Sequence, residues 1–122
     1  MRQRFSVLLL GILFLNAAIA RAATVEVTVR NFEFVPATIN INPGDTVIWN
    51  AVQGAHDVVA NDGSFSSGAV KQAPWTFSHK FNTEGTFRYF CSPHQGFGMV
   101  GTIVVGNGGL ATTPVYTVCE SR

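Results

Sequence analysis

Apolar and polar side chains alternate one by one along several stretches of this chain, beginning just after residue 23. Val25, Val27 and Val29 alternate with polar residues between positions 24 and 30, and Ile39 and Ile41 alternate with asparagines. A period of two places successive side chains on opposite faces of a β-strand. The pattern therefore predicts strands that bury one face, and no stretch of the chain shows a sustained helical period.

Further strand-like stretches follow at short intervals. They lie at residues 46–50, 57–60, 75–81, 86–91 and 100–105, and turn-forming residues occupy positions 42–45, 61–64, 84–85 and 106–109. After residue 22 the sequence holds 14 valines and one leucine, a balance that favours sheets over helices. About seven or eight short strands in one domain predict an all-β fold, a Greek-key β-sandwich.

The first 22 residues differ from the rest of the chain. Two arginines among the first four residues precede an apolar run, and Ala20-Arg21-Ala22 has the small-x-small pattern of a cleavage site. We therefore expect residues 1–22 to be a signal peptide and residues 23–122 to be a single exported domain. The alternative is an uncleaved membrane anchor, but the apolar core at residues 7–15 is short beside the ~20 residues of a spanning helix.

Charge and composition exclude several classes of protein. The whole chain carries 8 Lys and Arg against 7 Asp and Glu, and without residues 1–22 it would carry five basic and seven acidic side chains. A slightly acidic domain is not a nucleic-acid binder of the basic type. Ten Phe, two Trp and two Tyr supply ample apolar surface, which argues against disorder. Two cysteines are too few for a scaffold held by several disulfides.

The residues with the most distinctive chemistry lie near the end of the predicted domain. Cys91, His94 and Met99 follow one another in the pattern Cys-x2-His-x4-Met. A thiolate, an imidazole and a thioether are ligands for copper, and a second histidine would complete a trigonal set with a weak axial methionine. His56, which follows a predicted strand and a polar turn, is the candidate for that second histidine. Four protein ligands leave no position for a substrate, which favours electron transfer over catalysis.

These motifs resemble those of a known family. FRYFCSPHQGFGMVG at residues 87–101 and GAHDVVANDGSF at residues 54–65 are similar to the ligand loops of the cupredoxins, the small blue copper proteins of the plastocyanin, pseudoazurin and amicyanin group. The resemblance covers residues 24–105. It implies one type 1 copper ion per chain, held by His56, Cys91, His94 and Met99. It also implies a monomeric electron carrier with transient redox partners in an oxidising compartment such as the bacterial periplasm.

The chain departs from its relatives at two positions next to the expected ligands. Phe90 precedes the ligand cysteine where plastocyanins have tyrosine, and the acidic residues are scattered, so the second docking route of plastocyanins is not expected. Asp57 follows the first histidine where relatives often have asparagine, and we predict that it ties the two ligand loops together. Phe97 lies between two glycines and could be a core residue. Beside the exposed edge of His94, through which electrons would cross, we expect it instead to form part of an apolar docking patch.

Other interpretations of the same residues are possible. A copper chaperone or storage protein would use the same ligands, whereas a copper enzyme needs further metal sites that the one remaining histidine, His79, cannot build. We expect His79 to be structural. A disulfide between Cys91 and Cys119 would abolish the copper site, and otherwise Cys119 is free or pairs between chains. Residues 106–122 extend beyond the usual family end, and alternation at residues 115–118 predicts a short strand of no assigned function.

Overall fold

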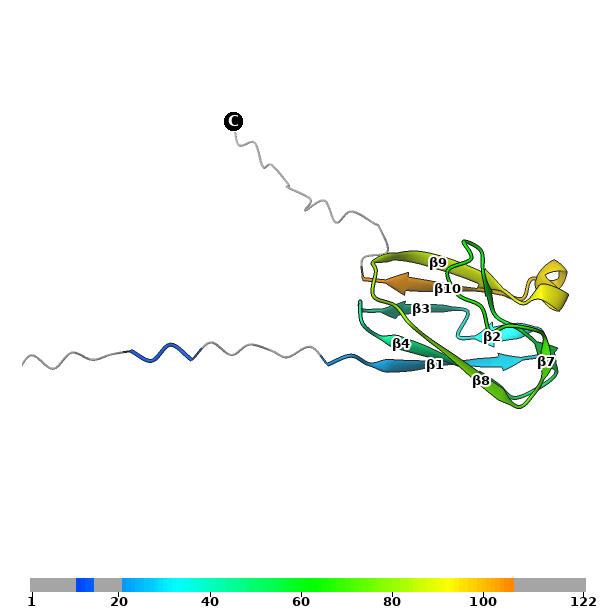
Figure 1. The fold of residues 1–122 in the computed structure, drawn as a ribbon, viewed down its shortest axis with the longest axis horizontal. Coiled ribbons are helices and arrows are strands. Elements are labelled where there is room, and N and C mark those ends of the chain that lie inside the picture. The colour runs from blue at the N-terminus through cyan, green and yellow to red at the C-terminus, as the bar shows by residue number, and fades with distance from the viewer. Residues whose placement is uncertain (1–10, 15–20, 107–122) are drawn as a thin grey trace, which may run out of the picture.

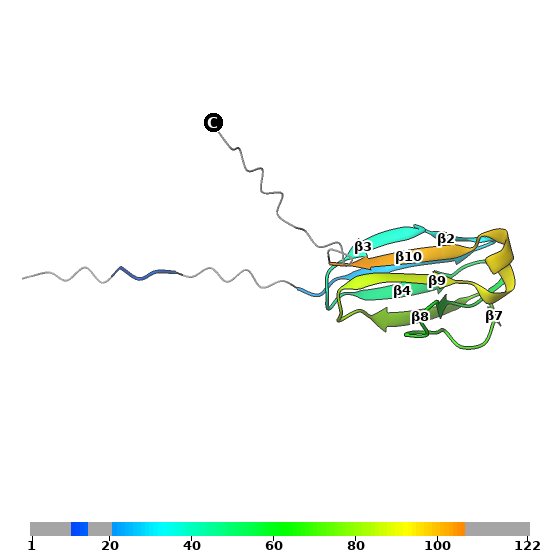
Figure 2. The ribbon, with the colours of Figure 1, turned by 90° about the horizontal axis from the view of Figure 1, so that it is seen from above.

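The fold is that of a computed structural model that describes residues 11–14 and 21–106. Short strands dominate these residues, with one short 3₁₀ helix, η1, near the end. The elements are β1 (Thr24–Arg30), β2 (Glu33–Val35), β3 (Thr38–Ile41), β4 (Thr46–Ala51), β5 (Ala55–His56), β6 (Val59–Ala60), β7 (Lys71–Gln72), β8 (Trp75–Lys80), β9 (Gly85–Phe90), η1 (Ser92–Phe97) and β10 (Val100–Val105). In Figures 1 and 2 the longer strands run lengthwise through the molecule.

Two four-stranded sheets form a sandwich. One has the order β2-β1-β4-β8 and the other β3-β10-β9-β6, while β5 and β7 form a separate two-stranded ribbon. The pairs β1–β4 and β10–β3 are parallel, and the remaining pairs are antiparallel. The described residues therefore confirm the predicted all-β sandwich.

The core between the sheets follows from the alternation in the sequence. Val27 and Val29 in β1 are fully buried, whereas the polar residues between and beside them are partly or fully exposed. Trp49 in β4 lies at the centre, where its ring stacks on Phe77 at 5.4 Å between centroids and meets the edge of Tyr89 at the same distance. Burial of such large aromatic side chains is the main stabilising contribution in a domain of this size.

The strands differ from the sequence-based expectation in number and in several boundaries, most at residues 57–60. The described residues form ten strands rather than seven or eight, because β2, β5, β6 and β7 are only two or three residues long. The single strand expected at residues 57–60 is reduced to β6 at Val59–Ala60. The Val58 N–H donates to Ser67 Oγ at 2.7 Å rather than to a strand carbonyl, and the Asp57 side chain accepts hydrogen bonds from Ser92.

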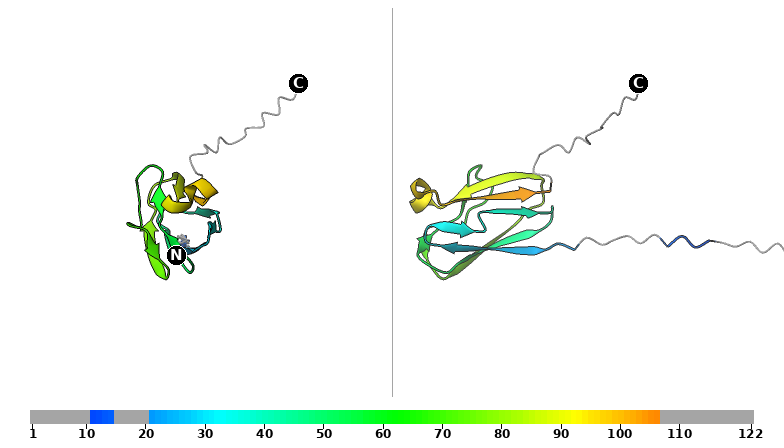
Figure 3. Two further views of the ribbon diagram at one scale, coloured as in Figure 1. Left: turned by 90° about the vertical axis from the view of Figure 1, so that its right-hand side faces the viewer. Right: turned by 180° about the vertical axis from the view of Figure 1, so that it is seen from behind.

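The loops and turns that connect the strands lie at two opposite ends of the sandwich. The η1 end consists of η1, the β1–β2 turn at residues 31–32 and the loops at residues 52–58 and 67–74, and the opposite end consists of the turns at residues 42–45 and 82–84. Figure 3 shows η1 at the end that faces the viewer in its left panel. Within residues 11–14 and 21–106 no helix has the length and apolarity that crossing a membrane requires. Cys119 and the strand expected at residues 115–118 lie outside the described residues.

Candidate metal centre

Cys91 lies between the end of β9 and the first turn of η1. Its backbone N–H donates to the Met99 carbonyl at 3.1 Å, and its own carbonyl accepts from the His94 N–H at 3.2 Å. Pro93 in the first turn favours this tight helix because its φ angle is already fixed near the helical value. At the other end of η1, Gly98 adopts the left-handed conformation with φ of 81°, which glycine tolerates best. The loop therefore holds Cys91, His94 and Met99 in a compact arc.

His56 reaches the same place from a distant part of the sequence. It ends β5, which pairs with β7, and its side chain is fully buried. A buried imidazole requires partners for both ring nitrogens. The fold thus brings a second histidine to Cys91 and His94, as the sequence predicted.

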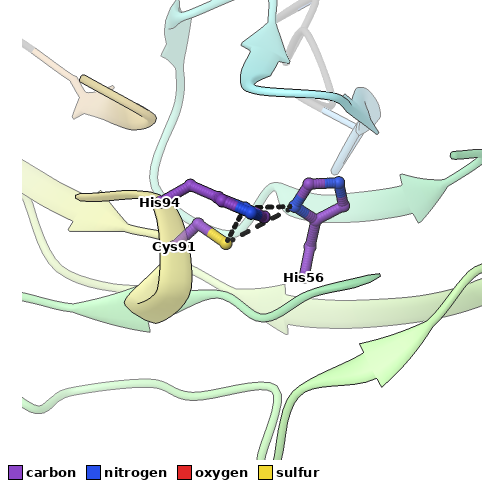
Figure 4. Close-up of side chains that lie close together, drawn as sticks. All are labelled: His56, Cys91 and His94. Carbon is purple, nitrogen blue, oxygen red and sulfur yellow. Dashed lines mark hydrogen bonds between the residues drawn. The ribbon is translucent and has the colours of Figure 1, made fainter. Parts of the chain in front are cut away.

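Three potential donor atoms of these side chains face one another (Figure 4). His56 Nδ1 lies 3.5 Å from Cys91 Sγ and 3.1 Å from His94 Nδ1, and Cys91 Sγ lies 3.6 Å from His94 Nδ1. A point equidistant from the three atoms is about 2.0 Å from each, close to metal–nitrogen distances in proteins. Two imidazoles and a thiolate in a triangle of this size fit a copper ion.

The electrostatics of the cluster favour a bound cation. Burial raises the pKa of the Cys91 thiol above its ordinary value of 9.0, while backbone hydrogen bonds from Asp57 and His94 oppose that rise. Burial, followed by the charge of His94, lowers the pKa of His56 below 6.5, and a hydrogen bond with the Gln53 backbone opposes this effect. Neutral imidazoles are metal ligands, and a metal ion deprotonates a coordinating thiol. Burial therefore favours the neutral, metal-binding form of His56, and the Cys91 thiolate requires a bound cation to be stable.

Met99 is joined to Cys91 and His94 by backbone hydrogen bonds. Its side chain is fully buried, and its backbone N–H donates to the His94 carbonyl at 3.2 Å. The backbone on either side of the 92–98 loop is thus fixed to the same arc that carries Cys91 and His94. The role of Met99 as an axial ligand stays a prediction.

The predicted tether between the ligand loops is confirmed. Asp57 is 4% exposed, and its two carboxylate oxygens accept hydrogen bonds from the backbone N–H and the hydroxyl of Ser92, both at 2.6 Å. Asp57 adjoins His56, and Ser92 adjoins Cys91. Charge-assisted hydrogen bonds of this length are the strong ones, so this carboxylate joins the two loops that carry the donor atoms.

The outer side of the cluster is partly open and apolar. His94 is partly buried, whereas Phe97 is 78% exposed, as the sequence analysis expected, and Phe32 is 54% exposed. The Phe32 ring meets the His94 ring edge-on, with centroids 4.8 Å apart, and lies 6.0 Å from the Phe97 ring. These three rings form a small aromatic surface at the η1 end.

The sequence patterns did not predict a role for Asn31 or Phe32, although both contact predicted ligands. Asn31 Oδ1 lies 3.2 Å from His56 Nε2, and Phe32 contacts His94. A separation of 25 residues between Asn31 and His56 leaves no spacing signal, so only the pairing of β1 with β2 and β4 brings the turn to the site.

The remaining histidine has a clear outcome, whereas the disulfide alternative stays open. His79 lies outside the cluster, partly buried between the rings of Phe65 and Phe81 at 5.0 and 4.8 Å between centroids, as expected of a structural residue. Among the described residues Cys91 has a free thiol. The alternative pairing involves Cys119, which the described residues do not include.

Together the sandwich and its His-Cys-His triangle define a protein with a single copper site at one end of a β-sandwich. The sequence pattern of the copper binding proteins of the plastocyanin/azurin family matches residues 21–106, and the chain belongs to this family. It is 37% identical to plastocyanin of Prochlorothrix hollandica over 113 residues, covering 81% of this chain and 86% of that one. It is 40% identical to plastocyanin of Scenedesmus fuscus over 83 residues, 59% of this chain and 85% of that one.

The fold comparison agrees with the sequence comparison. The crystal structure of pseudoazurin from Methylobacterium extorquens has a TM-score of 0.58 and 29% sequence identity, over 69% of this chain and 76% of that one. The recognised cupredoxin resemblance is therefore confirmed. The protein is a blue copper protein that binds one type 1 copper, and it is a copper-binding electron carrier.

Proposed function

We propose that the protein shuttles single electrons between redox partners in the periplasm, with copper held by His56, Cys91, His94 and Met99. The observation that carries this proposal is the triangle of His56 Nδ1, Cys91 Sγ and His94 Nδ1, whose sides are 3.1 to 3.6 Å. Bound copper supplies the Cu(II)/Cu(I) couple. The chain's own residues hold the donor atoms in a rigid arrangement between two loops, which limits rearrangement when the charge changes.

Electrons would enter and leave through the ring edge of His94. This ring is the partly exposed member of the triangle, whereas His56 and Cys91 are fully buried. Phe97 and Phe32 surround it with exposed apolar surface, which suits brief contact with a partner that must release quickly. The assignment to the periplasm rests on residues 1–22, which we propose are a cleaved signal peptide, leaving residues 23–122 as a monomeric domain that is not an enzyme.

The alternative function is copper delivery or storage, since a chaperone could use the same ligands. Such a protein must exchange its metal readily. The buried positions of His56 and Cys91 and the Asp57–Ser92 hydrogen bonds favour retention over exchange. Slow copper loss to a competing chelator together with fast electron exchange would exclude the alternative.

The decisive experiment loads the protein with copper(II) and records its visible spectrum and voltammogram. We expect an intense blue thiolate-to-copper band and a reversible one-electron wave, and Cys91→Ser should abolish the band. The matched control is Ser78→Ala, an exposed polar side chain in β8, which should leave the band in place. A colourless wild-type complex with normal copper uptake would contradict the proposal.

A further inference from the structure

The two-residue turn between β1 and β2 touches both histidines of the triangle. Asn31 lies 3.2 Å, Oδ1 to Nε2, from His56, and Phe32 contacts the ring of His94. The turn carries no donor atom of the triangle, and its strand β1 lies in the sheet opposite β9 and β10, which flank Cys91 and Met99. A single turn that contacts two ligands from outside their loops can fix the orientation of both.

Asn31 supplies a hydrogen-bond acceptor for the second ring nitrogen of His56. The ring is fully buried, and its Nδ1 faces Cys91 and His94, so the proton belongs on Nε2. Asn31 Oδ1 is placed to accept that proton's hydrogen bond, and the Gln53 backbone also bonds to the ring. A partner at the second nitrogen holds a ligand histidine in one tautomer and one ring orientation.

The loop before His56 is shaped to admit Asn31. Gly54 has φ of 77°, and a Cβ atom built on it would overlap Asn31 Oδ1 and lie 2.8 Å from His56 Nε2. Any other residue at this position would therefore displace the amide from the imidazole. The neighbouring Gln53 accepts a hydrogen bond from the Asn31 backbone N–H at 3.3 Å, which fastens the turn to the same loop.

The Phe32 contact acts on the other histidine. Its ring stands at 78° to the His94 ring with centroids 4.8 Å apart, an edge-to-face arrangement of the favourable kind. The centroid distance from His94 to Phe97 is longer, at 6.3 Å. Phe32 therefore restrains the tilt of His94 and excludes water from one side of its ring.

We propose that Asn31 and Phe32 form a clamp that positions both histidine ligands of the copper site, Asn31 through His56 Nε2 and Phe32 through the face of His94. They are positioning residues, since neither supplies a donor atom. The inference rests on the proposed function, because it takes His56 and His94 as ligands. It predicts that the turn sets copper affinity and the electronic structure of the site.

The test of the Asn31 half compares Asn31→Leu, Asn31→Asp and Gly54→Ala with the control Asn82→Ala, an exposed asparagine at the opposite end. Copper affinity is measured by chelator competition, and copper hyperfine splitting by electron paramagnetic resonance. Loss of an outer hydrogen bond to a ligand typically weakens metal affinity 10–100-fold, so we expect this loss in Asn31→Leu and Gly54→Ala. Asn31→Asp should restore affinity because a carboxylate accepts the same hydrogen bond, and Asn82→Ala should match the wild type.

The test of the Phe32 half compares Phe32→Ala and Phe32→Leu with Val70→Ala, a control at an apolar side chain that is 44% exposed. We expect Phe32→Ala to change the hyperfine splitting and the reduction potential, Phe32→Leu to change them less, and Val70→Ala to leave them unchanged. Thermal unfolding of the copper-free variants separates this effect from a purely structural one. If Phe32 had only a structural role, Phe32→Ala would lower the melting temperature and leave the copper spectra as in the wild type. That result would overturn the proposal.

Different results would refute the proposed function and the clamp. A wild-type protein without a blue band or a reversible wave refutes the proposed function. A blue, reversible wild type with Asn31→Leu, Gly54→Ala and Phe32→Ala variants of unchanged affinity, spectrum and potential refutes the clamp alone.

Discussion

The two ends of the sandwich use their carboxylates in different ways. At the opposite end Asp45 accepts hydrogen bonds from the backbone N–H groups of Ala23 at 2.8 Å and Asn42 at 2.9 Å. These bonds lower the pKa of the Asp45 carboxyl below its ordinary 3.8, and they tie the turn at residues 42–45 to the backbone just before β1, through backbone donors alone. At the η1 end Asp57 bonds instead to Ser92, 35 residues away, and joins two loops.

The same contrast holds for the other polar groups at the two ends. Hydrogen bonds complete the turn at residues 42–45, whereas at the η1 end three potential donor atoms, from His56, Cys91 and His94, lie within 4.8 Å of one another. Lone pairs that face one another repel unless a proton or a cation lies between them. The polar groups of the turn at residues 42–45 thus find their partners within the chain, whereas the three donor atoms at the η1 end need a bound copper ion. Metal binding should therefore add to the stability of the η1 end.

The largest effect on the copper site is expected from removal of the Asp57 carboxylate, in comparison with removal of Asp45. Asp57→Ala removes two hydrogen bonds to a charged group, each worth about 1.5–3 kcal/mol, and frees the loops that carry His56 and Cys91. We expect copper affinity to fall about 10–100-fold and the reduction potential to shift. Chelator competition and voltammetry of the copper-loaded protein measure both quantities.

The matched variant at the opposite end is Asp45→Ala. It should lower the melting temperature while the blue band, copper affinity and reduction potential remain those of the wild type. If Asp57→Ala left affinity and potential unchanged, or if Asp45→Ala altered them, the claim that Asp57 supports the copper site and Asp45 only the fold would be wrong.

A smaller effect is expected from two glycines in β10 and at its end. A Cβ on Gly101, near the η1 end, would overlap the buried ring of Tyr89 on the neighbouring strand, and overpacking of this kind costs about 1–3 kcal/mol. A Cβ on Gly106, at the opposite end, would lie 2.9 Å from the carboxyl oxygen of Glu84, an exposed side chain that can move. There the left-handed backbone, with φ of 65°, costs about 1 kcal/mol.

Chemical denaturation of Gly101→Ala and Gly106→Ala tests this ranking of unfolding free energies. We expect Gly101→Ala to be the less stable of the two. Equal losses would mean that Tyr89 can move aside as easily as Glu84, and that packing near the η1 end is looser than the structure indicates.

Sequence patterns predicted the sandwich because alternation is a local property. Val27 and Val29 had to face the core once residues 24–30 were a strand, and the Cys-x2-His-x4-Met spacing placed three side chains in one loop. Asp57 could be assigned to a tether because it adjoins His56. The strand expected at residues 57–60 begins only at Val59, because the Ser67 hydroxyl takes the Val58 N–H, an effect that propensity does not contain.

The sequence patterns could not predict contacts between segments that lie far apart in the chain. Asn31 meets His56 only because β1 pairs in parallel with β4, which is a choice of topology rather than of local pattern. The same holds for Phe32 and His94, whose contact joins the β1–β2 turn to η1. An asparagine and a phenylalanine in a turn carry no signal of their own for a metal site.

The smallest expected effect comes from His79, the histidine that lies away from the triangle. Burial lowers the pKa of His79 below its ordinary value of 6.5. The unfolded chain therefore binds a proton in a pH range where the folded protein does not, and stability rises with pH through that range. The contribution is fully present above about pH 6.5 and is lost progressively as the pH falls toward the lower folded pKa.

Replacement of His79 by phenylalanine keeps an aromatic ring against Phe65 and Phe81 and removes the titrating group. We expect the unfolding free energy of His79→Phe, relative to the wild type, to increase as the pH is lowered below about 6.5. Denaturant unfolding of both copper-loaded proteins across this range measures the difference, in which the contributions of all groups that the two proteins share cancel. Parallel pH profiles would show that His79 titrates alike in the folded and unfolded chain, and that its burial among the rings does not disfavour the proton.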